Sequence, residues 1–408
     1  MLMTFSGIKA DVGSIGGHTE PTARMLAEVN RRVAAACGDL LIDGLVTHTG
    51  DDIALLMSHT HGTGADAVHK FAWDCFLAAT AIAQEEGCYG AGQDLLVDAP
   101  SGNVRGAGPG VAEIEFERDP SSSDRPAEAF IVFTADKCGP GAFNLPLYMA
   151  FCDPMHDGGL LLNPRMHKGF SLEVIDMDYD GKGGAGDKIC RLDVPERGWD
   201  VAALLQNCDR FAIEGIWSRH NPNEQVVSVS ATRLHNIAGK YTGKDDPIAV
   251  VRTQGIFPAP EEVTEPFLIA PYVTGDARGS HVMPLLPVPI NTAVNGPYCH
   301  PICSALAFSM TASGKFADNR VDLFDGPAWD EARRRSQIKA LEMRKQGFFG
   351  AAMASVTEIA YTGLIDTHNA LEADFRVRKD MAATNGSVNG EAVDRAHVLM
   401  GVGEPDKS

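Results

Sequence analysis

The sequence is poor in basic residues for its size and has no long apolar run. Of 408 residues, 35 are Lys or Arg and 54 are Asp or Glu, so the formal net charge is −19. A surface of this charge repels phosphate backbones and anionic lipids, which argues against nucleic acid and membranes as partners. No apolar stretch approaches the roughly 18 residues of a membrane-spanning helix. Lys9 and Asp11 interrupt the N-terminus too early for a signal-peptide core.

Paired cysteines are also lacking. The nine cysteines are an odd number, and none of them forms a Cys-x-x-Cys motif. Reduced thiols in a cytoplasmic protein are therefore expected. Cys299 and Cys303 are the closest pair, but their helical spacing alone is weak evidence for a metal site.

The pattern of elements predicts a single α+β domain. Hydrophobic residues make up 44% of the chain, and neither a repeat nor a linker divides it. Strands are predicted at 4–10, 45–49, 53–59, 111–117 and 129–134, and near 170–176, 211–217, 226–232 and 248–252, with helices at about 19–37, 65–86 and 327–345. We expect a flexible loop at 176–188. The domain spans 1–368, and 369–408 is a polar tail, partly mobile or docked on a neighbouring subunit.

Acidic residues recur where predicted strands end. The polar residues of this kind are Asp11, Asp51, Asp52, Asp136, Asp245 and Asp246, with His18 and the pair Gln93-Asp94 in glycine-flanked loops. Any one of them alone is more often a solvated turn residue. If the strands share a sheet, however, these side chains converge, and an oxygen-rich cluster suits Mg²⁺.

The main glycine-rich loop covers residues 101–110. It is not a dinucleotide-binding fingerprint, because Pro109 and a strand follow where a helix should begin, and it lacks the Gly-Lys-Ser/Thr of a P-loop. Two interpretations stay open. It is either an irregular connection that needs positive φ, or a backbone-amide cradle for a phosphate with Arg105 nearby.

Lys244 also has two interpretations. Beside two aspartates alone, it is a salt-bridged ammonium. If those aspartates bind Mg²⁺, the cations and desolvation favour the neutral amine, which can form a Schiff base with a ketone. Tyr241, three residues earlier, then serves as a general acid/base. Its other interpretation, a half-buried strand tyrosine, is the one that the residues alone favour.

One further motif, Asp153-Pro154-Met155-His156-Asp157-Gly158, is similar to a metal motif of lithium-sensitive sugar and inositol phosphatases. It carries one extra residue, and Gly159 replaces the expected Ser or Thr. We interpret it as a turn.

Long colinear blocks resemble the bifunctional fructose-1,6-bisphosphate aldolase/phosphatases. The blocks are IKADVG (8–13), THTGDD (47–52), AGQDLL (91–96), SGNVRG (101–106), ADK (135–137), NLPLY (144–148), AGKYTGKDDP (238–247), RGSH (278–281) and DLFD (322–325). They span nearly the whole chain and fade after Tyr361.

The resemblance implies a layered α-β-β-α sandwich, several Mg²⁺ ions per site and a homo-octamer. It also implies a gluconeogenic enzyme, both lyase and hydrolase. Such an enzyme joins dihydroxyacetone phosphate to glyceraldehyde 3-phosphate by a Schiff-base aldol reaction, then hydrolyses the 1-phosphate of fructose 1,6-bisphosphate to give fructose 6-phosphate.

The resemblance further assigns roles to individual residues. Lys244 is the Schiff-base lysine, Tyr241 the proton donor and acceptor of the aldol step, and Asp11 the acid/base of hydrolysis. The metal ligands it implies are Asp11, His18, Asp51, Asp52, Gln93, Asp136, Asp245 and Asp246. The substrate-contacting positions it implies are His18, Tyr89, Gly102, Asn103, Lys137, Gln254, Arg278, Asn295 and Tyr361.

The chain departs from the family pattern at two of these positions. Asn295 stands before Gly-Pro where the family has Asp, and only part of the motif around Tyr361 survives. Two alternatives to the bifunctional enzyme stay open. One is a fructose-1,6-bisphosphatase with little aldolase activity, against which Lys244 and Tyr241 argue. The other is a non-catalytic sugar-phosphate sensor, which would have lost metal ligands.

Overall fold

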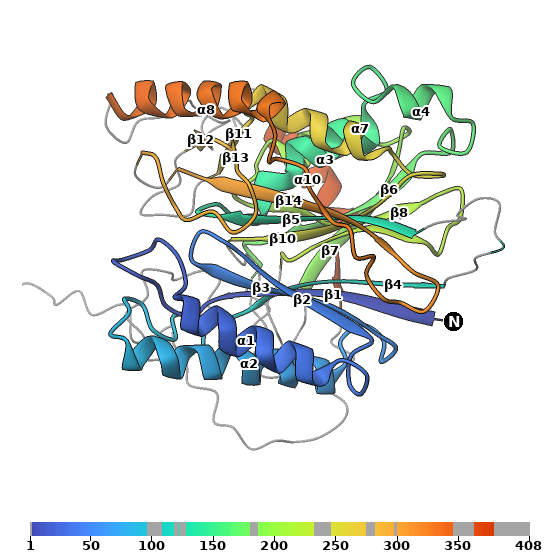
Figure 1. The fold of residues 1–408 in the computed structure, drawn as a ribbon. Coiled ribbons are helices and arrows are strands. Elements are labelled where there is room, and N and C mark those ends of the chain that lie inside the picture. The colour runs from blue at the N-terminus through green and yellow to red at the C-terminus, as the bar shows by residue number, and fades with distance from the viewer. Residues whose placement is uncertain are drawn as a thin grey trace, which may run out of the picture.

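Two β-sheets lie face to face, and helices cover the outer face of each (Figure 1). This computed structural model describes residues 2–95, 108–117, 121, 128–179, 187–231, 246–274, 282–297, 300–345 and 363–378. The layering confirms the predicted α+β, α-β-β-α sandwich. Among the described residues, no helix is both long and apolar enough to cross a membrane.

The smaller sheet has the strand order β2-β3-β1-β4 and is antiparallel throughout. Its strands are β1 (Leu2–Asp11), β2 (Asp43–Thr49), β3 (Asp52–His59) and β4 (Gly110–Glu117). The helices α1 (Ala23–Ala36) and α2 (Asp66–Glu85) cover its outer face. α1 begins after Thr22, whose hydroxyl accepts a hydrogen bond from the Met25 N–H. That cap places its start slightly later than predicted.

The larger sheet has ten strands in the described part of the chain, in the order β13-β14-β5-β10-β9-β8-β6-β7-β16, with β15 paired to β14. These strands are β5 (Glu128–Asp136), β6 (Phe170–Asp176), β7 (Asp187–Val194), β8 (Phe211–Ser218), β9 (Gln225–Val229), β10 (Ile248–Thr253), β13 (Leu286–Pro287), β14 (Ile302–Met310), β15 (Val321–Asp322) and β16 (Arg376–Arg378). A separate ribbon pairs β11 (Tyr272–Thr274) with β12 (Val282–Pro284).

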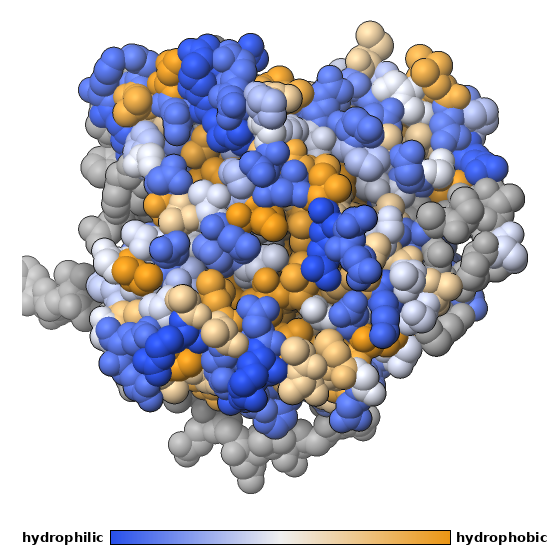
Figure 2. All heavy atoms as spheres, viewed as in Figure 1, coloured by the Kyte–Doolittle hydropathy of each residue, from blue (hydrophilic) through white to orange (hydrophobic). Residues whose placement is uncertain are grey.

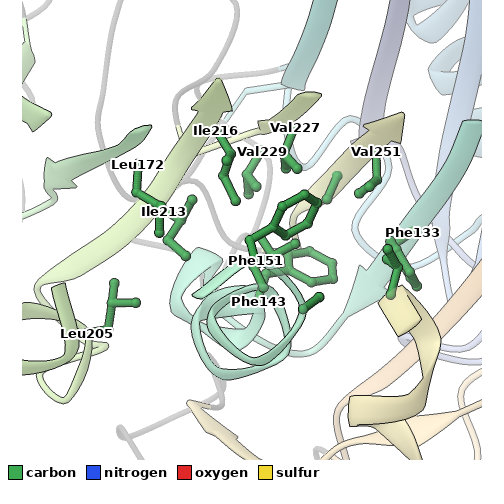
Figure 3. Close-up of a cluster of buried hydrophobic side chains, with 14 of the residues drawn as sticks. Phe133, Phe143, Phe151, Leu172, Leu205, Ile213, Ile216, Val227, Val229 and Val251 are labelled. Carbon is green, nitrogen blue, oxygen red and sulfur yellow. The ribbon is translucent and has the colours of Figure 1, made fainter. Parts of the chain in front are cut away.

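The outer face of the larger sheet carries the second helical layer (Figure 1). Its helical segments are η1 (Pro140–Phe143), α3 (Asn144–Cys152), α4 (Gly158–Leu162), α5 (Gly198–Leu205), α7 (Pro260–Thr264), η2 (Glu265–Ile269), α8 (Pro327–Lys345), α10 (Leu364–Leu371) and η3 (Glu372–Asp374). Figure 3 shows the core beneath this layer, where Phe143 and Phe151 pack against apolar side chains of the sheet such as Ile213 and Val251.

A separate apolar core lies between the two sheets. Alternate residues of β1, such as Met3 and Phe5, pack there against Phe130 and Phe308 of the larger sheet. The intervening residues Ile8, Ala10 and Val12 pack toward α1 and α2 instead. On the face seen in Figure 2, hydrophilic side chains cover the outer helices, and apolar ones are visible mainly between these layers.

Most predicted elements are confirmed, and the misses are strands of the larger sheet, the β11–β12 ribbon and the helices of the second layer other than α8. The hairpin at 45–59, the helix at 65–86 and the helix at 327–345 are present as expected. The motif at 153–158 is a turn, as interpreted. The strands β7 and β14 have no counterpart in the prediction, although β14 is central to its sheet.

The predicted loop and tail lie only partly within the described residues. β6 ends at Asp176 and β7 begins at Asp187, so regular strands border the loop at 176–188, whose residues 180–186 lie outside the described ones. Of the tail, η3 and β16 belong to the fold, and β16 pairs with β7. Residues 379–408 lie outside the described part.

Candidate active site and metal centre

The smaller sheet brings three carboxylates to one end. β1 ends at Asp11, directly opposite Asp52 of β3 in the strand register. Gly50 and Asp51 make the turn between β2 and β3, and Asp52 begins β3. Gly50 has a φ of 58°, a left-handed conformation that favours glycine. The site therefore lies at the end of β1 remote from the labelled N-terminus in Figure 1.

The larger sheet supplies two more carboxylates from the facing side. Asp136 is the last residue of β5, and Asp246 precedes β10, which pairs antiparallel with β5 so that Ile248 faces Thr134. The convergence inferred for strands of one sheet is therefore reached with strands of two sheets. The carboxylates converge because two stacked sheets present strand ends at the same edge.

These side chains form two groups that can each hold a metal ion. Their ligand atoms lie within 4.8 Å of one another within each group. The first metal group is Asp11, His18 and Asp51. The second metal group is Asp52, Asp136 and Asp246. Oxygen donors with a single imidazole suit a hard divalent cation such as Mg²⁺ better than a thiolate-preferring metal.

Gln93 supports this interpretation. The segment 89–94 runs beside 11–14, where Ser14 and Tyr89 exchange backbone hydrogen bonds and the Asp94 N–H bonds to the Asp11 carbonyl at 3.0 Å. Gln93 is buried, and its Oε1 has no hydrogen-bond partner among the described residues. A buried amide oxygen is costly to leave without a partner, so the residues present fit a cation at this site.

Two lysines lie among the carboxylates. Nζ of Lys137 lies 2.7 Å from Asp51 Oδ1 and 2.7 Å from Asp136 Oδ1, and thus bridges the two groups. Nζ of Lys9 lies 2.5 Å from Asp52 Oδ2 on the buried side of the site. The Lys137 side chain is partly exposed, and its contact with an anionic substrate stays a prediction.

Neighbouring side chains and burial raise the pKa values of Asp11 and His18 in the first metal group. Burial, with the nearby charge of Asp51, raises the pKa of Asp11 to about 7. The carboxylates of Asp11, at 3.7 Å, and Asp51, at 2.9 Å, raise the pKa of His18 to about 10. A metal ion that uses this imidazole must displace its proton, so metal affinity should rise with pH.

A ring of hydroxyls supports the ligand-bearing ends from within. Thr49 of β2, Thr134 of β5 and Ser304 of β14 are buried and lie 2.6–2.7 Å apart pairwise. Each hydroxyl can donate one bond and accept another. The ring therefore fixes the turn at Asp51 and Asp52 relative to Asp136.

The expected substrate-contacting residues lie at different distances from the metal groups. The ring of Tyr89 meets that of His18 edge-on at 5.0 Å. Asn295 is exposed, next to Val294, whose N–H bonds to the Thr19 carbonyl. Gln254 follows β10 at the end remote from Asp246, so the whole strand, about 17–20 Å long, lies between Gln254 and that ligand. One copy of the chain thus does not bring Gln254 to the metal groups.

Several expected site residues lie outside the described part of the chain. They are Lys244, Tyr241, Asp245, Gly102, Asn103, Arg278 and Tyr361. The roles that the resemblance gives them stay predictions.

Sequence reasoning assigned no role to two residues that hold the ligands. Asp94 Oδ2 accepts a hydrogen bond from the Asp11 N–H at 2.9 Å, and Lys9 holds Asp52. The signal for Lys9 is its register, because a lysine stands on the inward side of an otherwise apolar strand that ends in an expected metal ligand. Asp94 directly follows an expected ligand, but nothing local distinguishes it from a turn residue.

Fold and site together define the class, which is a layered α-β-β-α protein whose facing sheets gather carboxylates into two groups able to hold divalent metal ions. The chain belongs to the fructose-1,6-bisphosphatase family, whose sequence model matches residues 2–376.

Similar proteins from several organisms carry one name, fructose-1,6-bisphosphate aldolase/phosphatase. The one from Thermus thermophilus is 51% identical over 375 residues, which cover 92% of this chain and 100% of the relative. The one from Cenarchaeum symbiosum is 44% identical over 364 residues, 88% of this chain and 91% of the relative. The one from Ignicoccus hospitalis is 43% identical over 383 residues, 93% and 94% respectively.

Proposed function

We propose that the chain is a gluconeogenic enzyme with two activities. It condenses dihydroxyacetone phosphate with glyceraldehyde 3-phosphate and then hydrolyses the 1-phosphate of the resulting fructose 1,6-bisphosphate to give fructose 6-phosphate. The observation that carries the phosphatase half is the convergence of the two carboxylate groups around Lys137. The names of the relatives support the aldolase half.

The proposed cofactor is Mg²⁺, several ions per site. Asp11, His18, Asp51, Asp52, Asp136 and Asp246 would hold it, with Gln93 and Asp245. Bound divalent ions offset phosphate charge and activate water for attack on phosphorus. The residues of the chain bind and orient the substrate. In this scheme Lys137 contacts a phosphate, and Asp11, whose pKa burial raises to about 7, transfers a proton near neutral pH.

For the aldol step, Lys244 is the proposed amine and Tyr241 the proposed acid/base. The amine attacks the ketone of dihydroxyacetone phosphate, and loss of water leaves a Schiff base on the lysine. Removing a proton from the neighbouring carbon gives the nucleophile that attacks the aldehyde. Hydrolysis then returns the free amine. A simple phosphatase would require neither side chain.

We also propose a cytoplasmic homo-octamer in which residues 1–368 carry the activity and 369–408 form an extension. The separation of Gln254 from the metal groups within one copy supports assembly if that residue contacts substrate. The absence of paired cysteines in the sequence is consistent with a reducing compartment.

One coupled assay tests the proposal. Triose phosphates are supplied with Mg²⁺, and fructose 6-phosphate and inorganic phosphate are measured. The unmodified chain should yield both. Lys244→Arg should yield neither from triose phosphates but should retain phosphate release from added fructose 1,6-bisphosphate. If the unmodified chain released phosphate but did not condense triose phosphates, the plain phosphatase would be favoured. If the unmodified chain showed neither activity, the non-catalytic sensor would be favoured.

Borohydride trapping identifies the reactive amine directly. Reduction in the presence of dihydroxyacetone phosphate should attach the substrate to Lys244, because only a Schiff base is reduced to a stable adduct. Labelling at Lys240 or Lys137 instead would refute the assignment, and Lys244→Arg is the matched blank.

A further inference from the structure

Lys9 occupies a position that the fold otherwise reserves for apolar side chains. Along β1, Met3 and Phe5 face the core between the sheets, and a Cβ on Gly7 would meet Ile248 of β10 at 2.7 Å. Lys9 is the next residue on this side, and its side chain is only 1% exposed. An ammonium in such a place is strongly destabilising unless it is closely paired, so its partners indicate its role.

Those partners belong to the second metal group, one from each sheet. Nζ of Lys9 donates to Asp52 Oδ2 at 2.5 Å and to the main-chain carbonyl of Asp246 at 2.7 Å. It thereby joins a carboxylate of the smaller sheet to the backbone of the facing sheet. With Oδ2 engaged in this way, Oδ1 is the atom that Asp52 can present to a metal ion.

Asp246 needs such support because its backbone is unusual. Its φ is 51°, a left-handed conformation uncommon for a residue with a side chain. Its N–H bonds to the Cys138 carbonyl at 2.7 Å, and its Oδ1 accepts from the Lys137 N–H at 2.6 Å. The third of these contacts is the hydrogen bond from Lys9 Nζ to the Asp246 carbonyl. Together these contacts fix the direction in which the Asp246 carboxylate points.

We propose that Lys9 is a positioning residue for the divalent cation held by Asp52, Asp136 and Asp246. It orients the Asp52 carboxylate and holds the Asp246 backbone in its left-handed conformation. Its side chain is buried, whereas that of Lys137 is partly exposed. The inference rests on the proposed metal dependence and adds a residue to it.

An alternative role predicts the opposite result. If Lys9 only offsets the negative charge of the carboxylates, its removal makes the site more negative and Mn²⁺ should bind more tightly. If Lys9 positions the ligands, its removal lets Asp52 and Asp246 reorient, and Mn²⁺ should bind more weakly. The direction of the change therefore distinguishes the two roles.

The experiment is a titration of the purified chain with MnCl₂, in which free Mn²⁺ is followed by electron paramagnetic resonance. The variants are Lys9→Met and Lys9→Gln. Lys9→Met is neutral and similar in length. Lys9→Gln is shorter and retains a donor, so it decides the question if Lys9→Met does not fold. We expect Mn²⁺ affinity at the site of Asp52, Asp136 and Asp246 to fall about tenfold or more in both variants.

Arg252→Met is the matched control. Arg252 is also fully buried and paired with carboxylates, Glu128 at 2.8 Å and Glu224 at 2.7 Å, but these belong to no metal group. Its loss should destabilise the fold and leave Mn²⁺ affinity within about twofold of the unmodified value. An equal weakening in Arg252→Met would mean that general loosening causes the effect, and would overturn the inference.

The remaining outcomes separate this inference from the proposed function. Unchanged or tighter Mn²⁺ binding in folded Lys9 variants would overturn the role of Lys9 and leave the metal site standing. The metal site itself would be overturned if the unmodified chain did not bind Mn²⁺. It would also be overturned if Asp51→Asn left Mn²⁺ binding unchanged. A selective loss in the Lys9 variants alone supports the proposal.

Discussion

Gly50 and Asp136 lie in contact across the two sheets. A Cβ built on Gly50 would overlap the Asp136 carboxylate, and the Gly50 N–H bonds to the Thr292 carbonyl at 2.9 Å. The turn that carries Asp51 and Asp52 can therefore approach the end of β5 only because residue 50 has no side chain. Together with the hydroxyl ring of Thr49, Thr134 and Ser304, this contact sets the spacing between the two metal groups.

Gly50→Ala should therefore abolish metal-dependent activity. The left-handed φ of 58° adds strain of about 1–3 kcal/mol, and the new methyl group must push Asp136 aside. We expect lower stability in urea unfolding and loss of Mg²⁺-dependent phosphate release. Gly87→Ala is the control, because Gly87 has a φ of 68° but open space around the added methyl group. Equal activity losses in both variants would contradict the contact argument.

Asp51→Asn should weaken Mg²⁺ binding and phosphate release. Asp51 contacts both His18 and Lys137, and the substitution removes a charged oxygen ligand from the first metal group. We expect phosphate release from fructose 1,6-bisphosphate to fall about 100-fold at limiting Mg²⁺, with partial recovery at high Mg²⁺. Asp74→Asn, at an exposed pair with Lys70, should change neither property. Full phosphatase activity in EDTA would refute the metal site altogether.

His59 should make the fold sensitive to acid. His59 is buried, its ring donates to Ser6 at 2.8 Å, and the His61 N–H donates to its other nitrogen. Burial lowers the pKa of His59 to about 4, from an ordinary value of 6.5. Between these values the unfolded chain binds a proton that the folded chain excludes, so stability falls as pH falls.

The expected loss is about 3 kcal/mol of unfolding free energy between about pH 7 and pH 4. His59→Gln should be less stable at pH 7 but should show a shallower decline in acid, as measured by urea unfolding across this range. His61→Gln, at an exposed neighbour, should keep the slope of the unmodified chain. An unchanged slope in His59→Gln would assign the acid sensitivity to other groups.

Asp157 should act in the opposite direction. Its Oδ1 and Glu262 Oε1 both accept from the Gly159 N–H at 2.8 Å, which brings the two carboxyl groups together between α4 and α7. Burial and the proximity of Glu262 raise the pKa of Asp157 to about 7. The folded chain therefore keeps a proton that the unfolded chain releases above about pH 4, and stability falls as pH rises from about 4 to 7.

Asp157→Asn should be more stable than the unmodified chain at about pH 8, by the order of 2 kcal/mol, because the amide is always neutral. The difference should vanish near pH 4. Thermal unfolding at the two pH values measures it. Asp153→Asn is the control, since that carboxylate accepts from the Met155 N–H in the same turn. A destabilised Asp157→Asn at pH 8 would show that the pair is not repulsive there.

Local patterns were sufficient to predict much of the fold and the types of residue in the site. The alternation in β1, the hairpin at Gly50 and the helix from Pro327 to Lys345 follow from periodicity and turn chemistry, which act between near neighbours. The expected ligands Asp11, Asp51, Asp52 and Asp136 could be chosen because each stands where an apolar strand ends. These features depend on burial of one face of a helix or strand, and the spacing of apolar residues in the sequence shows which face that is.

Only the tertiary structure decided which strands became neighbours. β4 and β5 are consecutive in the chain, yet β4 pairs with β1 in the smaller sheet and β5 joins β10 and β14 in the larger one. Strand pairing depends on contacts between residues far apart in sequence, and periodicity reports which face is buried but not against what. For the same reason the roles of Lys9 and Gly50 emerged only once Asp246 and Asp136 were placed opposite them, across the space between the two sheets.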